Sequence, residues 1–213
     1  VDYISAGDLI EATQDTGSFV HISGMLKSVA IKISKICNDL RLLSSGPRAG
    51  FNEINLPPMQ PGSSIMPGKV NPVIPEVVNQ VAFEVIGADM TIAMASEGGQ
   101  LQLNVFEPLI AYKLFTSINM MRRAFYSLGE KCIKGITANE EICMNNILNS
   151  VTLVTCLNPI LGYEKSSAIA KEALATNKRV YDLILEQELF TKEELDELLK
   201  PENMVNNFIK ETK

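Results

Sequence analysis

The feature that most constrains the fold of this chain is a very long helical pattern near its start. At about 1.5 Å per residue, a continuous helix from residue 8 to residue 43 would span roughly 50 Å, more than a small compact domain needs. Helices of this length occur mainly in bundles, so the pattern predicts a helical bundle. Its apolar residues recur mostly at steps of three and four, as on one helix face: Leu9, Ala12, Phe19, Val20, Ile22, Leu26, Val29, Ala30, Ile33, Ile36, Cys37, Leu40 and Leu43.

Two more long apolar patterns follow. Residues 44–47 (SSGP) end the first helix, because glycine and proline stop helices. A second helix is expected over residues 72–98, with two prolines in its first turn and Asn71 as its N-cap. A third is expected over residues 108–132. The methionines of these helices fall at helical spacings and are expected to fill the core: Met90, Met94, Met120 and Met121.

After about residue 135 the helical patterns of the sequence become short. Short helical patterns cover residues 140–149, 164–176, 178–188 and 192–199, and the last begins with the capping-box residues Thr191 and Glu194. Signals for β-strands are nearly absent. The predicted fold class is therefore all-α: a long-helix bundle over residues 1–140, including a loop with the sequence GSSIMPGKVNP, and a small C-terminal helical domain over residues 141–213.

The composition of the chain limits which binding partners and which cellular compartment are expected. A formal net charge of -6 argues against nucleic acid or an acidic membrane surface as a partner. No purely apolar run approaches the roughly 20 residues of a membrane span, and no signal peptide opens the chain. The cysteines lie far apart without a CxxC pair, which indicates reduced thiols and a cytoplasmic protein: Cys37, Cys132, Cys143 and Cys156.

The long connection before the second helix contains GSSIMPGKVNP, residues 62–72. Such a loop can be a simple connector, although its length favours a functional segment. It is not a phosphate-binding loop, because five residues separate its glycines and Val70 replaces the required Ser or Thr. The GxSxG motif of serine hydrolases is absent, and His21 lies far upstream on the first helix. No metal-ligand spacing occurs, so no metal is expected.

GSSIMPGKVNP resembles the signature of the aspartase/fumarase superfamily. The neighbouring segments ICNDLRLLSSGPRAGFNEINLPPMQ, VIPEVVNQVAFEVIG and EGGQLQLNVFEP are similar to those of aspartate ammonia-lyases. A fumarase would read closer to TQCE after KVNP and would carry a more polar version of the QLQLN segment. The similarity covers essentially the whole chain and implies a helical bundle shared between four subunits. It also implies that the chain, which starts at VDYIS without methionine, is the later half of a larger protein.

The resemblance also assigns roles within the loop. It implies that Ser63 is the base that abstracts the Cβ proton of L-aspartate, so that ammonia leaves and fumarate forms. Ser64, Lys69 and Asn71 match substrate-binding positions. Glu76 matches a supporting carboxylate that pairs with a histidine of another subunit, and that histidine is not His21. No cofactor is implied.

Two alternatives stay open. The nearest is a class II fumarase, which would add water instead of ammonia to fumarate and give L-malate. The other is a non-catalytic helical oligomerisation module, with the loop as an inert connector. Because family active sites combine segments of three subunits, the chain by itself is expected to be inactive.

Overall fold

The computed structural model describes residues 2–60, 62, 66 and 70–206, and the side chains up to residue 204. The described residues fall into two compact units, one ending at Asn139 and the other starting at Glu140. The sequence placed this boundary at residue 140. Each unit is described by itself.

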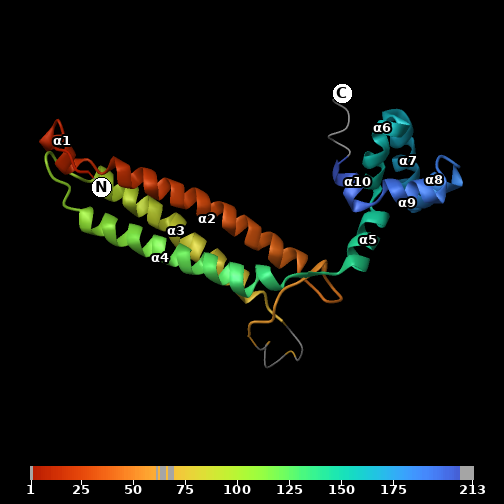
Figure 1. Ribbon diagram of the computed structural model, residues 1–213, viewed down its shortest axis with the longest axis horizontal. Coiled ribbons are helices and arrows are strands. Elements are labelled where there is room, and N and C mark those ends of the chain that lie inside the picture. Colours follow the sequence, from red (N-terminus) through yellow and green to blue (C-terminus); the bar gives the residue numbers. More distant parts are fainter. Residues whose placement is uncertain (1, 61, 63–65, 67–69, 207–213) are drawn as a thin grey trace. The chain divides into compact units, whose positions relative to one another are not determined.

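The first unit is a bundle of three long helices that run side by side (Figure 1). α3 packs along both α2 and α4, so it forms the centre of this unit. The elements of the unit are α1 (Leu9–Gln14), α2 (Gly17–Leu43), β1 (Ile54–Asn55), α3 (Val73–Glu97), α4 (Glu107–Lys131), the short 3₁₀ helix η1 (Ile133–Gly135) and β2 (Thr137–Ala138).

The prediction of one continuous helix over residues 8–43 is wrong, because the chain breaks between α1 and α2. Asp15 is extended, and its carboxylate accepts a hydrogen bond from the Gly17 N–H at 3.0 Å. Thr16 is buried, and its hydroxyl lies 2.6 Å from that of Ser96 on α3. A break of only two residues leaves the apolar spacing nearly intact, so periodicity alone did not reveal it.

The bundle core consists largely of small and medium-sized side chains. Alanines at the helix contacts let the backbones approach closely, and the aliphatic residues fill the space between them. The buried apolar residues of α2, α3 and α4 include Ala30, Cys37, Val78, Ala82, Val85, Ile92, Ala95, Ile110, Leu114, Met121, Ala124 and Leu128.

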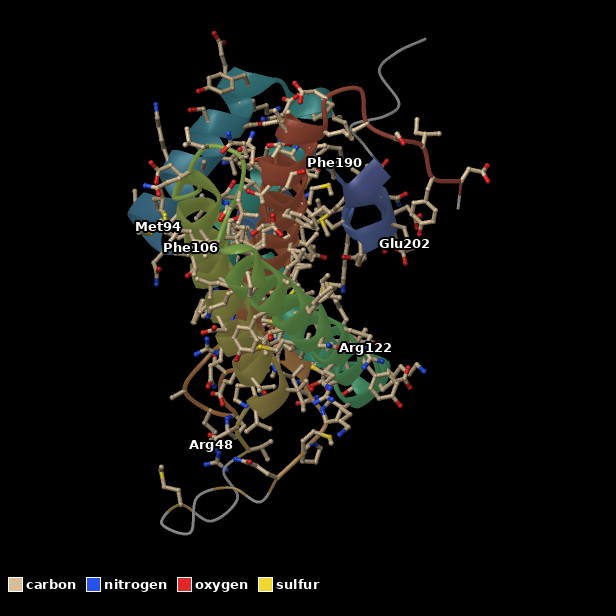
Figure 2. The ribbon with its side chains drawn as sticks, turned by 90° about the vertical axis from the view of Figure 1, so that its left-hand side faces the viewer. Arg48, Met94, Phe106, Arg122, Phe190 and Glu202 are labelled. Carbon is tan, nitrogen blue, oxygen red and sulfur yellow. The ribbon has the colours of Figure 1, made fainter. Side chains whose placement is uncertain are left out.

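Not every apolar residue of these helices faces the core. The prediction that all four methionines fill it is confirmed for Met121, whereas Met120 is only half-buried. It is wrong for Met90 and Met94, which are 65% and 67% exposed. Met94 stands out from its helix in Figure 2. The helices are apolar on more faces than they bury within the unit, and other large exposed side chains on them are Met25, Ile31, Phe83, Tyr112, Phe115 and Tyr126.

In the part of the chain that the structure describes, α3 alone is long and apolar enough to cross a membrane, judged by length and composition. The core helix of a soluble protein passes the same test. Since α3 packs against α2 and α4 and carries the buried polar residues Asn79 and Asp89, its place in the bundle core explains its composition.

The carboxylate of Asp89, on α3, forms a polar contact with α2. Its carboxylate accepts hydrogen bonds from the Ser23 hydroxyl at 2.7 Å and from the Lys27 ammonium at 2.5 Å. Burial alone raises the pKa of the Asp89 carboxyl, but the hydrogen bonds and the positive charge of Lys27 outweigh it and hold the pKa below its ordinary value. The contact fixes the register of the two helices.

The second unit is a small helical domain with its own core. Its elements are α5 (Glu140–Asn149), the 3₁₀ helix η2 (Val151–Leu157), α6 (Asn158–Leu161), α7 (Tyr163–Thr176), α8 (Val180–Glu186), α9 (Lys192–Leu198) and α10 (Pro201–Asn206). The core residues include Leu153, Leu157, Ile169, Leu183, Ile184 and Leu195. The capping box at α9 is confirmed, since Glu194 and Thr191 each bond the other's backbone N–H.

The predicted all-α class is confirmed, with one small exception. β1 and β2 form an antiparallel pair of two residues each, with Ile54 opposite Ala138 and Asn55 opposite Thr137. Such short strands give no alternating pattern to detect. η2, α6 and α10 were also not expected, because each is short and lacks a sustained apolar period.

We predict that Asp89→Asn lowers the free energy of unfolding at neutral pH by about 1–3 kcal/mol, because the Lys27 and Ser23 contacts lose their charged partner. The pKa of Asp89 is lower in the folded state, so its contribution is present at neutral pH and is lost as the pH falls through the folded-state pKa. Urea unfolding at neutral pH and in acid well below the ordinary Asp pKa of 3.8 should show the gap between wild type and variant closing in acid.

Asp39→Asn is the matched control, because Asp39 pairs with Lys35 on the surface of α2 and exposed pairs contribute little. An equal gap at both pH values, or an equal effect of the control, would contradict the role given to Asp89.

Candidate functional site

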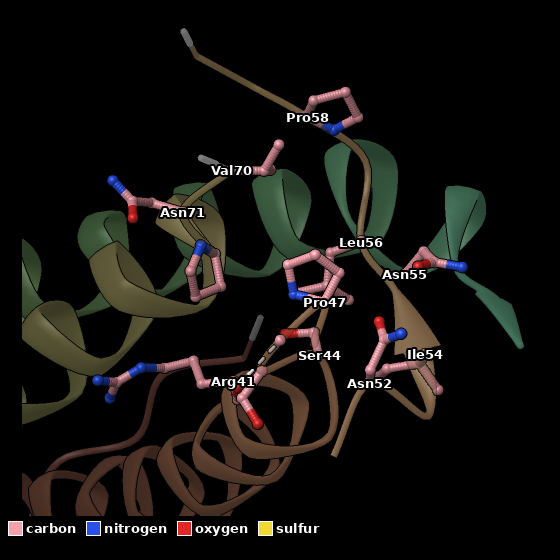
Figure 3. A pocket seen from close by; sticks show the side chains of 13 residues that line it. Arg41, Ser44, Pro47, Asn52, Ile54, Asn55, Leu56, Pro58, Val70 and Asn71 are labelled. Atoms are coloured by element: carbon pink, nitrogen blue, oxygen red, sulfur yellow. Dashed lines mark hydrogen bonds between the residues drawn. The ribbon is translucent and has the colours of Figure 1, made fainter. Parts of the chain in front are cut away.

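A pocket of about 450 Å³ lies between the end of α2, the loop that follows it, β1 and the segment leading into α3 (Figure 3). Among the described residues that line it, Arg41 is the charged one, and the other polar groups are hydroxyls and amides. The lining includes Ser44, Asn52, Asn55, Val70 and Asn71. The rest of the lining is apolar and includes Pro47, Ile54 and Leu56, so the pocket combines an apolar surface with one cationic residue and several neutral hydrogen-bonding groups.

The loop after α2 forms one wall of this pocket through a tight turn. Asn52 donates its backbone N–H to the Ser45 carbonyl at 2.6 Å, and Phe51 donates its N–H to the Ser45 hydroxyl at 3.1 Å. Gly50 has a φ of +156°, and a Cβ there would lie 2.5 Å from the Ser45 carbonyl carbon. Only glycine fits this position.

A buried asparagine connects the pocket to the bundle. Asn79, on α3, is 2% exposed, and its amide donates to the Ser34 carbonyl at 3.0 Å and to the Asn38 side chain at 3.1 Å. Its oxygen accepts a hydrogen bond from Nη1 of Arg41 at 3.2 Å. Arg41 also lines the pocket, so this group holds the last turn of α2 and the first turns of α3 together at the pocket.

The structure places two of the five predicted site residues. Asn71 lines the pocket, and Glu76 lies partly buried in the first turn of α3. Ser63, Ser64 and Lys69 lie outside the described residues.

The prediction that Asn71 caps α3 with its side chain is wrong. The N-cap is Pro72, without a side-chain cap, and the Asn71 carbonyl accepts the Val73 N–H at 2.9 Å. The Asn71 side chain is therefore not used as a cap.

Sequence reasoning did not single out Arg41 or Asn79. The available signal was a set of polar residues inside otherwise apolar helical patterns, since a buried asparagine needs hydrogen-bond partners. Asn38 and Asn79 are such positions.

Other candidate chemistry lies elsewhere. His21 is exposed on α2, and the described residues contain no group of three or more His, Cys, Asp or Glu side chains that could hold a metal ion.

Cys37 and Cys132 are buried free thiols. Burial, together with the neighbouring Cys132, raises the pKa of Cys37 to about 11, and burial also raises the pKa of Cys132. Both are thus protonated at neutral pH and suited to packing, not to nucleophilic attack.

Comparison with known proteins agrees with the resemblance drawn from the loop. A family model described as Lyase matches residues 2–87, and one described as Fumarase C C-terminus matches residues 153–206. The chain is 65% identical over 204 residues to an aspartate ammonia-lyase of Helicobacter pylori strain 26695, a match that covers 96% of this chain and 44% of the relative. It is 55% identical over 203 residues to the aspartate ammonia-lyase of Escherichia coli K12, covering 95% of this chain and 42% of the relative.

Solved structures give the same fold. A fumarate lyase/delta crystallin from Brucella melitensis, bound to cobalt, superposes with a TM-score of 0.87 at 50% identity, covering 98% of this chain and 45% of that one. A class II fumarase from Schistosoma mansoni superposes with a TM-score of 0.85 at 34% identity, covering 97% of this chain and 43% of that one.

The fold, the loop sequence and these matches together define the class: the chain belongs to the aspartase/fumarase superfamily. Within that superfamily its sequence is similar to the aspartate ammonia-lyases. The chain spans less than half the length of the curated relatives it matches.

We predict that Gly50→Ala destabilises the protein by about 1–3 kcal/mol, because the new methyl group would overlap the Ser45 carbonyl in a backbone region that only glycine adopts readily. Gly24→Ala is the matched control. A Cβ at Gly24, within α2, meets nothing within 4 Å, and alanine favours a helix by about 0.8–1 kcal/mol over glycine. Thermal unfolding measures both variants, and a Gly50→Ala variant as stable as wild type would contradict the turn described above.

Proposed function

We propose that the full-length protein is an aspartate ammonia-lyase, which eliminates ammonia reversibly from L-aspartate to give fumarate. The observation that carries this proposal is the identity of 55% to 65% with proteins of that name over nearly all of this chain. The proposal concerns the full-length protein, because the chain spans less than half of each relative's length.

Ser63 is the proposed base. The reaction requires removal of a proton from the carbon beside a carboxylate, and the resulting carbanion is very unstable in water. The Ser63 alkoxide takes the Cβ proton, the electron pair of the C–H bond forms the new double bond, and the C–N bond breaks as ammonia leaves with its electron pair. A serine can act as this base only in a preorganised electropositive site that stabilises both the alkoxide and the carbanion.

Three further residues are proposed to supply that environment. The Lys69 ammonium and the Asn71 amide bind a substrate carboxylate, with Ser64 contributing a donor beside the base. Asn71 lines the described pocket and stands directly before the long helix α3, whose N-terminal end favours anions. Glu76, one turn into α3, is proposed to pair with a histidine of another subunit.

A class II fumarase is the second candidate. The match of residues 153–206 to the Fumarase C C-terminus model and the 34% identity to a solved class II fumarase favour it. These likenesses are less specific than the higher identity to aspartate ammonia-lyases. For the chain by itself, a non-catalytic helical module remains the alternative, and we expect no ammonia release from residues 1–213 alone.

Self-association into a homotetramer is part of the proposal. Large apolar side chains such as Phe83, Met90 and Phe115 are 60% to 65% exposed on the bundle helices, and an apolar surface of this kind is typical of an interface. We also propose a cytoplasmic protein without nucleic-acid or membrane partners, on the basis of the net charge of -6 and the free cysteines.

The test is turnover by the full-length protein. Incubation with L-aspartate should raise the ultraviolet absorbance of fumarate and release ammonia, whereas L-malate should give neither signal at a comparable rate. Ser63→Ala should reduce turnover of L-aspartate by a factor of about 100 or more, because the base is lost, without changing the oligomeric state. Turnover of L-malate alone would favour fumarase, and near-normal turnover by Ser63→Ala would contradict the assignment of the base.

The proposed assembly predicts a tetrameric mass for the full-length protein in light scattering. Phe115→Glu should shift that mass toward smaller species, because it places a charge in an apolar interface. Tyr163→Glu is the matched control, since Tyr163 is an exposed aromatic residue of the second unit. A monomeric wild-type protein, or equal dissociation of both variants, would contradict the assignment of the interface to the bundle helices.

A further inference from the structure

The last residues of the first unit lie against the wall of the pocket. β2 pairs with β1, and β1 belongs to the wall because Ile54 and Asn55 line the pocket. Next to this pair, Gly135 approaches Pro57 so closely that a Cβ on Gly135 would lie 2.5 Å from the proline ring. The segment at residues 135–139 is thus packed against the segment at residues 52–57.

Asn139 makes the central contacts between these segments. Its backbone N–H donates to the Glu53 carbonyl at 2.9 Å. Its side-chain amide donates to the Asn52 carbonyl at 2.8 Å. Its side-chain oxygen accepts a hydrogen bond from Nδ2 of Asn55 at 2.8 Å, and the same Nδ2 reaches the Thr137 hydroxyl at 3.1 Å.

The partners of Asn139 are residues of the pocket wall. Asn52 and Asn55 both line the pocket, and Figure 3 shows them beside Ile54, on the opposite side of the view from Asn71 and Arg41. We call Asn52, Asn55 and Asn139 the asparagine clamp. An amide can donate and accept at once, so one Asn139 side chain holds two wall residues.

We propose that Asn139 is a positioning residue for the reaction in this pocket, acting through Asn52 and Asn55. The inference rests on the proposed function, because it takes the pocket beside Asn71 as part of the active site. Two strands of two residues each do not hold their own pairing in water, so the side chains of the clamp supply what the backbone lacks.

The clamp also lies at a particular point of the chain. Asn139 is the last residue of the first unit, and Glu140 is the first residue of the second. The wall of the pocket is therefore tied to the point from which the C-terminal unit starts. A displacement of about 1 Å in a site wall can lower turnover by a factor of about 100. The hydrogen bonds that hold this wall in place are therefore expected to affect catalysis.

The test compares variants of the full-length protein. Asn139→Ala should lower kcat for L-aspartate by a factor of about 10–100, with KM changed less than about threefold, because positioning acts on the transition state more than on binding. Asn139→Asp keeps the acceptor for Nδ2 of Asn55 but loses the donor to the Asn52 carbonyl and to the Asn55 side-chain oxygen, so its kcat should also fall below the wild-type value. Asn203→Ala is the matched control, since its amide donates to the Glu197 carbonyl in the second unit, and it should keep wild-type kcat.

A double-mutant cycle separates a clamp from independent effects. The loss in kcat of the double variant Asn55→Ala/Asn139→Ala should be smaller than the combined losses of the single variants, because the two side chains share the hydrogen bonds between them. Additive losses, wild-type kcat in Asn139→Ala, or an equal loss in Asn203→Ala would overturn the inference. If Asn139→Ala fails to fold, Asn139→Asp and Asn55→Ala decide by the same criteria.

Failure of the proposed function would look different. A wild-type protein without turnover of L-aspartate rejects the function and with it the catalytic role of Asn139. Hydrogen exchange then still reports on the clamp, since the Asn139 N–H should be protected in wild type and should exchange faster in Asn55→Ala. Unchanged exchange in that variant counts against the clamp, whatever the substrate.

Discussion

The pocket depends on one buried contact, the hydrogen bonding of Asn79 between α2 and α3. This side chain is almost fully buried and is bonded to Ser34, Asn38 and Arg41. An unpaired amide in that position would be costly, so the helices are held in the one register that satisfies it. That register brings the end of α2, with Arg41, beside the start of α3, where Asn71 enters the pocket. The remaining walls, made by the turn at Gly50 and by the asparagine clamp, are built on this junction.

The proposed chemistry requires that this site stabilise two negatively charged species. A serine base must lose a proton, and the carbanion it generates must be stabilised, so the surroundings need positive charge and rigid donors. The buried Asn79 holds the Arg41 guanidinium, and paired amides fix the pocket wall, so the site is rigid. The described lining residues include no acidic side chain. The same helices leave large apolar side chains exposed, which supports the proposed self-association.

Much of the fold could be predicted from the sequence, because long amphipathic patterns report on long helices. The three bundle helices and α5, α7, α8 and α9 followed from spacing, and the capping box marked the start of α9. The break at Asp15 and Thr16 could not be predicted from spacing, because it depends on a tertiary contact with Ser96. The exposure of Met90 and Met94 could not be predicted, because an apolar period does not show which apolar residues of a helix face the core and which stay on the surface. The loop sequence indicated Asn71 and its neighbours, but Arg41, Asn79 and Asn139 matter through contacts between residues distant in the sequence.

A structure of the full-length Ser63→Ala variant with L-aspartate bound tests the central claim most directly, namely that position 63 and Asn71 serve one anion-binding site. We expect the residue 63 side chain to face Cβ of the amino acid, and the Asn71 amide to lie within about 3 Å of one of its carboxylates. An amino acid bound with residue 63 turned away from Cβ, or bound away from the pocket that Asn71 lines, would contradict both the base and the site.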